Sequence, residues 1–101
     1  MSTSVSTVSG GATRAVFKYP LPVLDDYVRV DMPRGAELLC VQMQHGTPCV
    51  WALVDPTVAL MTRVLRIAGT GHPIERDVGR YVGTFQMHGG ALVFHVFEVT
   101  P

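Results

Sequence analysis

The stretch GTGHP, at residues 69–73, gathers two glycines, a hydroxyl and an imidazole within five positions. In a turn the two glycines supply positive φ angles, and Pro73 keeps the residue before it extended. Amides exposed by such a turn can bind an anion, which a nearby guanidinium completes by bidentate contact. The stretch lacks the spacing of a P-loop or a dinucleotide-binding loop, and no helix-forming segment follows it. We interpret it as a tight turn, with an anion-binding loop as the alternative, formed by Gly69, Thr70, Gly71, His72, Arg66 and Arg80.

The other residue types that bind metals or act as nucleophiles are dispersed along the chain, namely Cys40, Cys49, His45, His88 and His95. Zinc ligands usually come in close pairs such as CxxC or HxxxH, and neither pairing occurs here. The GxSxG motif of serine hydrolases is also missing, and the acidic residues are scattered. The sequence therefore predicts neither a metal nor a cofactor, and it favours binding over catalysis.

The elements that must position these side chains are expected to be short strands. From Ala15 onward, apolar residues recur with a period near two, and turn residues interrupt them about every 8–12 positions. This pattern predicts an all-β fold of about seven antiparallel strands in a sandwich or a small barrel. Any helix is limited to one turn around residues 56–60 or 74–78. Residues 1–13, rich in Ser, Thr and Gly, predict a disordered leader, and residues 14–101 a single β domain.

The first hairpin can be aligned residue by residue. If His45 and Gly46 form a two-residue turn, the residue numbers of each facing pair add up to 91, as in Gln44 with Thr47. In this register both faces of the hairpin are largely apolar. Only 16% of the residues are charged, against about 25% in a typical soluble domain, while 48% are hydrophobic. We therefore predict a homo-oligomer, favouring a dimer, with an interface on one face of this hairpin at Leu38, Trp51 and Leu53.

The last hairpin is expected to turn at Gly89 and Gly90, so that facing residues sum to 179. This register places His95 opposite Thr84 and Val82 opposite Phe97. An imidazole beside a threonine is most simply a tethered side chain on a half-buried face. A role in contacting a ligand is the alternative.

The charge balance and the apolar pattern limit the partners and the location. Lys and Arg total 8, as do Asp and Glu, so no net field attracts nucleic acid or an anionic membrane. No apolar run approaches the roughly 18 residues that span a bilayer. The first residues lack the basic and apolar regions of a secretory signal, and the two cysteines suit free thiols. These features predict a cytoplasmic protein that binds neither nucleic acid nor membrane.

Five short motifs together resemble a family of small uncharacterised bacteriophage and prophage proteins, known as a domain of unknown function. They are KYPL (18–21), WALVDP (51–56), GTGHP (69–73), YVGTF (81–85) and HGGALVFHVFE (88–98), and the similarity spans residues 17–99. The segment TVALMT, at residues 57–62, is more apolar than the connector of that family. The resemblance implies a viral or prophage origin and an all-β fold, and it transfers no catalytic residue.

We therefore expect a non-enzymatic phage-type accessory protein in the cytoplasm of a bacterial host. It would bind and neutralise a host factor, either a defence protein or a small nucleotide derived from a defence system. A minor virion or assembly component is the alternative expectation, and a small enzyme of unknown reaction is the second alternative.

Overall fold

The computed structural model describes residues 13–22 and 25–100, and the strands found there confirm the all-β fold with seven antiparallel strands. The predicted leader, apart from Thr13, lies outside the described residues. The strands are β1 (Ala15–Pro20), β2 (Tyr27–Pro33), β3 (Glu37–Gln44), β4 (Thr47–Val54), β5 (Leu60–Gly69), β6 (Val78–Met87) and β7 (Leu92–Val99). One short 3-10 turn, η2 (His88–Gly90), joins β6 to β7, whereas a helical turn was expected, if anywhere, near residues 56–60 or 74–78.

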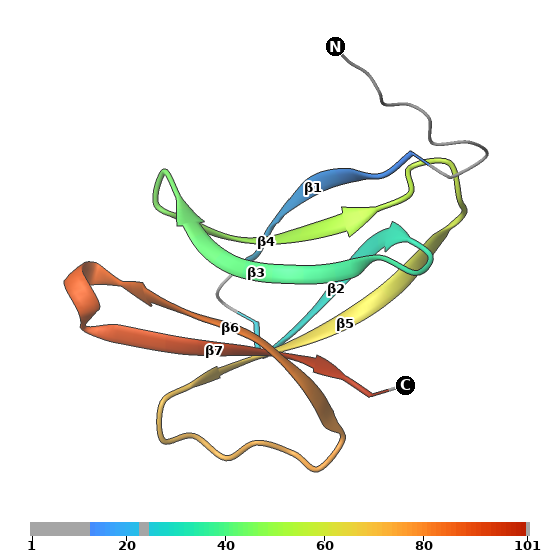
Figure 1. Ribbon diagram of the computed structural model, residues 1–101. Helices are drawn as coiled ribbons and strands as arrows, with labels where there is room; N and C mark the ends of the chain where they lie inside the picture. Colours follow the sequence, from blue (N-terminus) through green and yellow to red (C-terminus); the bar gives the residue numbers. More distant parts are fainter. Residues whose placement is uncertain (1–12, 23–24, 101) are drawn as a thin grey trace.

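The strands form two sheets that lie one over the other (Figure 1). The three-stranded sheet has the order β1-β4-β3, and the four-stranded sheet has the order β2-β5-β7-β6. All neighbouring strands are antiparallel. Of the two predicted architectures, the chain adopts the sandwich, because the two sheets do not close into one.

The core lies between the facing surfaces of the two sheets, as alternating apolar residues require. In β2, for example, Val28, Val30 and Met32 are buried while the residues between them are exposed. Because directly opposed residues share a face, the register also assigns the inner residues of the neighbouring strands. The buried core cluster comprises Leu21, Val28, Val30, Met32, Ala36, Leu38, Val41, Val50, Ala52, Val54, Leu65, Ile67, Phe85 and Val96.

The β3–β4 hairpin keeps the predicted register only near its turn. Pairs from Gln44–Thr47 to Cys40–Trp51 sum to 91, and His45 and Gly46 both have positive φ, as a type I′ turn requires. A bulge at Leu39 then shifts the register, so that Leu38 pairs with Ala52. Leu38 is consequently 1% exposed in the core, while Leu39 is 43% exposed. The prediction that Leu38 shares a face with Trp51 and Leu53 is therefore wrong.

The β6–β7 hairpin also follows the predicted register near its turn. Residues from Gly83–Val96 to Met87–Leu92 pair as expected, including Thr84 with His95. The Ala91 N–H donates to the His88 carbonyl across Gly89 and Gly90, both of which have positive φ, as the expected turn requires; the β6–β7 ladder itself ends one pair earlier, at Met87 and Leu92. A register shift between Tyr81 and Gly83 pairs Tyr81 with Phe97, in the place expected for Val82.

The two sheets approach each other closely where β3 runs beside β6. A Cβ added to Gly83 would lie 3.1 Å from both the backbone nitrogen and the Cβ of Val41. Farther along the same strands, Arg80 Nη2 donates to the Leu38 carbonyl at 3.0 Å. A Cβ at this crossing would be tighter than nine in ten real Cβ contacts, so any residue other than glycine requires Val41 to shift by a few tenths of an ångström.

Candidate functional site

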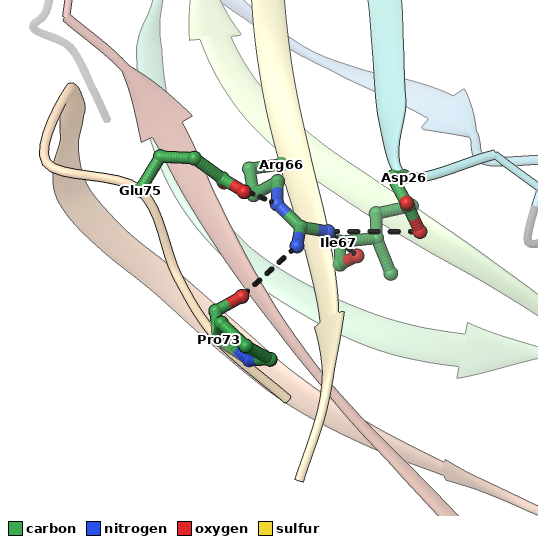
Figure 2. Close-up of polar contacts among 5 residues, drawn as sticks. All are labelled: Asp26, Arg66, Ile67, Pro73 and Glu75. Carbon is green, nitrogen blue, oxygen red and sulfur yellow. Dashed lines mark hydrogen bonds and ion pairs between the residues drawn. The ribbon is translucent and has the colours of Figure 1, made fainter. Parts of the chain in front are cut away.

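Arg66 organises the segment that follows β5, and it is buried although it lies on the outer face of the four-stranded sheet (Figure 2). Its Nε donates to Glu75 at 2.8 Å, its Nη1 to the Ile67 carbonyl at 2.6 Å, and its Nη2 to the Pro73 carbonyl at 3.2 Å. Asp26 lies 3.7 Å from Nη1. The guanidinium therefore joins β5 to the GTGHP segment and to the residue before β2.

The hydrogen bond between Arg66 and Glu75 also shifts the pKa of both groups. Hydrogen bonds from Arg66 and then from Tyr27 lower the pKa of Glu75 to about 2. The hydrogen bond to Glu75 raises the pKa of Arg66, although burial lowers it. The Arg66 guanidinium also lies 5.3 Å from the centre of the Tyr27 ring, in cation–π range. Arg66 and Glu75 therefore stay charged across the physiological range, and the residue that was predicted to bind an anion acts within the fold.

GTGHP is a β-turn, in agreement with the interpretation that we favoured. The His72 N–H donates to the Gly69 carbonyl at 3.1 Å, and Gly71 has a φ of 87°, as the third position of a type II turn requires. Only Gly71 supplies the positive φ that was expected of both glycines. Gly69 instead makes room for an imidazole, because a Cβ there would lie 3.1 Å from His72 Nδ1.

The structure brings only part of the predicted anion-binding set together. Gly69, Thr70 and His72 line a pocket of about 290 Å³, whose other walls are the apolar residues Ala91, Leu92, Val93 and Phe94. Arg80 instead lines a separate pocket of about 440 Å³, beside the ion pair of Arg63 with Glu98. Arg66 and Arg80 were suggested as anion ligands because they lie near GTGHP in the sequence. In the structure, Arg66 on β5 and Arg80 on β6 lie at different sites.

A file of hydrogen-bonded polar side chains crosses the outer face of β6, β7 and the end of β5. Tyr81 OH lies 2.5 Å from Thr84 Oγ1, which lies 2.9 Å from His95 Nδ1. The other ring nitrogen, His95 Nε2, lies 2.7 Å from Thr70 Oγ1. We call Tyr81, Thr84, His95 and Thr70 the His95 file.

Two features of the fold assemble this file. Residues three apart in a regular strand point to opposite faces, but the irregularity between Tyr81 and Gly83 puts Tyr81 and Thr84 on the same face. The Thr70 N–H donates to the Val93 carbonyl at 3.2 Å, which holds the turn beside β7. The pair of Thr84 with His95 was predicted from the hairpin register, whereas Tyr81 was missed because nothing local in the sequence indicates the irregularity.

The file can remain hydrogen-bonded in either charge state of His95. Neutral imidazole carries one N–H and one acceptor nitrogen, and a hydroxyl can both donate and accept. With the proton on Nε2, His95 donates to Thr70, whose hydroxyl lies 3.4 Å from the Val93 carbonyl, while Thr84 donates to Nδ1. When both nitrogens carry protons, both threonines accept. The two threonines therefore hold the ring in one orientation, and both of its nitrogens are occupied.

Aromatic residues lie beside the file on the same outer face. The register places Tyr27, Arg66, Phe97 and Tyr81 in one row across all four strands. The rings of Tyr81 and Phe97 make an edge-to-face contact, with centroids 5.5 Å apart. Tyr81 remains 53% exposed. This face thus exposes an aromatic residue beside several hydroxyl groups.

The residues of the predicted dimer interface separate in the structure. Leu38 is buried within the chain itself, so its burial needs no second copy. Trp51 and Leu53 lie on the outer face of the three-stranded sheet, opposite Lys18 and Val16 of β1, and both are half-buried. Cys40 and Cys49 are free thiols.

Neither a metal-binding cluster nor a membrane span is found in the described part of the chain. Over residues 13–22 and 25–100, no three His, Cys, Asp or Glu side chains gather closely enough to hold a metal ion. No helix in that part is long and apolar enough to cross a membrane.

Comparison with known proteins identifies a family. No curated protein matches the chain, and no solved structure matches it. A domain of unknown function, DUF7352, matches residues 12–101, a range that includes all seven described strands and the whole His95 file. An uncharacterised family is also what the motifs in the sequence predicted. The chain belongs to the DUF7352 family.

Proposed function

We propose that this protein is a non-enzymatic, phage-type accessory protein that binds and neutralises a host protein in the bacterial cytoplasm. The binding surface is the outer face of the four-stranded sheet, at the His95 file and Phe97. The observation that carries the proposal is the exposed Tyr81 ring, which Phe97 and Thr84 hold in place.

The composition of this face suits a protein interface. Tyrosine is among the residues enriched at such interfaces and often contributes a large share of the binding energy. Side chains that are already hydrogen-bonded to one another lose little conformational entropy when a partner docks. The contacts from Tyr81 to Thr70 therefore favour a surface that is ordered before binding.

A protein partner is favoured over a small nucleotide. A phosphate is usually bound by arginine or lysine. The guanidinium of Arg66 is buried and donates to Glu75, Ile67 and Pro73, and Arg80 lines a different pocket. The pocket beside Thr70 and His72 is otherwise walled by apolar side chains.

Binding is favoured over catalysis by the contacts of His95. A histidine that activates a hydroxyl nucleophile is commonly oriented by a carboxylate on its other ring nitrogen. In the described part of the chain, both ring nitrogens of His95 face threonine hydroxyls, and neither contacts a carboxylate.

The test is native mass spectrometry of the tagged protein purified from its own host. We expect a complex with one host protein that Tyr81→Ala abolishes and that Gln42→Ala, an exposed site on the other sheet, leaves intact. A retained small anion in place of a protein would favour the nucleotide alternative. Recovery of the chain in purified virions would favour the assembly role, and substrate turnover that His95→Ala abolishes would favour an enzyme. Each of these three results would overturn the proposal.

A further inference from the structure

Strand β1 lies at the edge of its sheet and, among the described residues, pairs with β4 alone. One hydrogen bond shows which residues of β1 direct their backbone groups toward β4: the Leu21 N–H donates to the Pro48 carbonyl at 2.9 Å. Because hydrogen-bonded pairs alternate in an antiparallel ladder, Tyr19 and Phe17 direct their backbone groups toward β4. Val16 and Lys18 therefore direct their N–H and carbonyl groups away from the sheet.

Proteins usually protect such an edge with charges, prolines or bulges. On β1 the only charged side chain is that of Lys18, and its ammonium donates to Gln44 Oε1 on β3, two strands away from the edge. Val16 and Phe17 are 55% and 39% exposed. Among residues 13–22 and 25–100, the edge thus combines backbone groups that have no partner with exposed apolar side chains.

We propose that β1 pairs with β1 of a second copy of this chain, antiparallel about a two-fold axis that passes beside Phe17. The result is one continuous six-stranded sheet with the order β3-β4-β1-β1-β4-β3. Val16 exchanges both backbone hydrogen bonds with Lys18 of the second copy, and the symmetry repeats the exchange. The two Phe17 side chains face each other across the axis, where antiparallel Cα atoms lie about 4.5 Å apart.

The charges of Lys18 on β1 and of Arg14, just before β1, select this register over its neighbours. A two-fold axis beside Lys18 would place the two Lys18 side chains opposite each other, and an axis beside Val16 would place Lys18 opposite Arg14. Like charges in directly opposed positions destabilise a sheet. The axis beside Phe17 instead places Lys18 opposite Val16 and Arg14 opposite Pro20, whose carbonyl accepts from the Arg14 N–H.

Of the three other edge strands, β3 and β6 run beside each other, and β2 is a weaker candidate than β1. The Ile67 N–H donates to the Asp26 carbonyl, so the same alternation directs the backbone groups of Arg29 and Asp31 outward. The side chains of β2 that face the core are already buried within one chain. A second copy at β2 would therefore cover one exposed apolar residue, Tyr27, beside the charged Arg29 and Asp31, whereas at β1 it covers both Val16 and Phe17.

The first test is the mass in solution, measured by sedimentation velocity at tens of micromolar. We expect twice the chain mass of 11.0 kDa. Lys18→Pro should return the mass to that of one chain, since it removes an outward N–H without breaking a β1–β4 bond, and circular dichroism checks that the variant folds. The matched control Arg29→Pro removes an outward N–H from β2 and should leave the dimer intact. A wild-type monomer, a dimer that survives Lys18→Pro, or a dimer lost only in Arg29→Pro would overturn the proposal.

The second test needs no proline and examines the register directly. Phe17→Cys should form an intermolecular disulfide rapidly under mild oxidation, because the two positions face each other within disulfide range. Arg14→Cys is the matched control, because its counterpart lies six residues away along the second strand, at about 20 Å. The wild-type chain gives the background from Cys40 and Cys49. Equal cross-linking of both variants, or none in Phe17→Cys, would exclude this register. A dimer that forms only after residues 1–12 are removed would contradict the proposal that the full chain dimerises through β1.

Discussion

Replacing Arg66 with methionine should destabilise the fold, because the guanidinium holds together three parts of the chain. Its side chain is 7% exposed, and methionine can fill much of the same space without replacing the donors. The change removes the donor to the Ile67 carbonyl and the donor to the Pro73 carbonyl (Figure 2). Glu75 loses its partner as well, but it is half-exposed and can be hydrated.

The expected loss follows from the two bonds to carbonyl groups. A hydrogen bond that involves a charged group contributes about 1.5–3 kcal/mol, and a buried acceptor left without its donor costs a similar amount. The ion pair with Glu75 adds little, because exposed pairs are screened by water. Allowing for partial access of water to Pro73, we expect about 2–4 kcal/mol. In a chain of this size that corresponds to a fall in melting temperature of about 10–20 °C.

Urea unfolding of Arg66→Met measures the free energy directly, with Glu75→Gln as the control that keeps the guanidinium. The control should lose less than half as much stability. Hydrogen exchange at residues 70–77 should accelerate in Arg66→Met, because this segment loses its attachment to β5. A loss below about 0.5 kcal/mol, the level of an ordinary surface substitution, would refute the structural role of Arg66. If Arg66→Met lost partner binding at unchanged stability, Arg66 would be a ligand-binding residue, as the sequence suggested.

Three further predictions follow from contacts at other sites. Gly83→Ala should lower stability by about 1–3 kcal/mol in thermal melting, because the added Cβ overlaps the Val41 backbone of the facing sheet; unchanged melting would mean that the sheets separate freely. The pKa of Glu75 is lowered from 4.5 to about 2, so its contribution to stability is complete above pH 4.5 and is lost as the pH falls toward 2. Acid titration of Glu75→Gln should lack this component, and identical curves for both proteins would contradict it. Thr70→Ala should weaken binding of the host protein while His72→Ala should not, because Thr70 contacts His95 whereas His72 packs over a glycine. A binding titration in which only His72→Ala weakens binding would contradict this prediction and place the binding site at His72.

The sequence by itself determined the class of fold and the pairing of residues close to the turns. Alternation of apolar residues and the spacing of turn residues are local properties, and they predicted seven strands. The position of each predicted turn placed His95 opposite Thr84 and Gln44 opposite Thr47, because a short turn fixes the register of the residues beside it. The β-turn at GTGHP followed from its glycines and proline in the same way.

Only the tertiary structure decided which faces these residues occupy farther from the turns. The irregularities at Leu39 and near Val82 change the register without a signal in the sequence, and they bury Leu38 and bring Tyr81 to Thr84. Pairing of β5 with β7, which lie far apart in the chain, brings Thr70 to the other side of that ring. Arg66 is buried for a similar reason: a charge can leave water only where partners surround it, and its partners come from three separate segments.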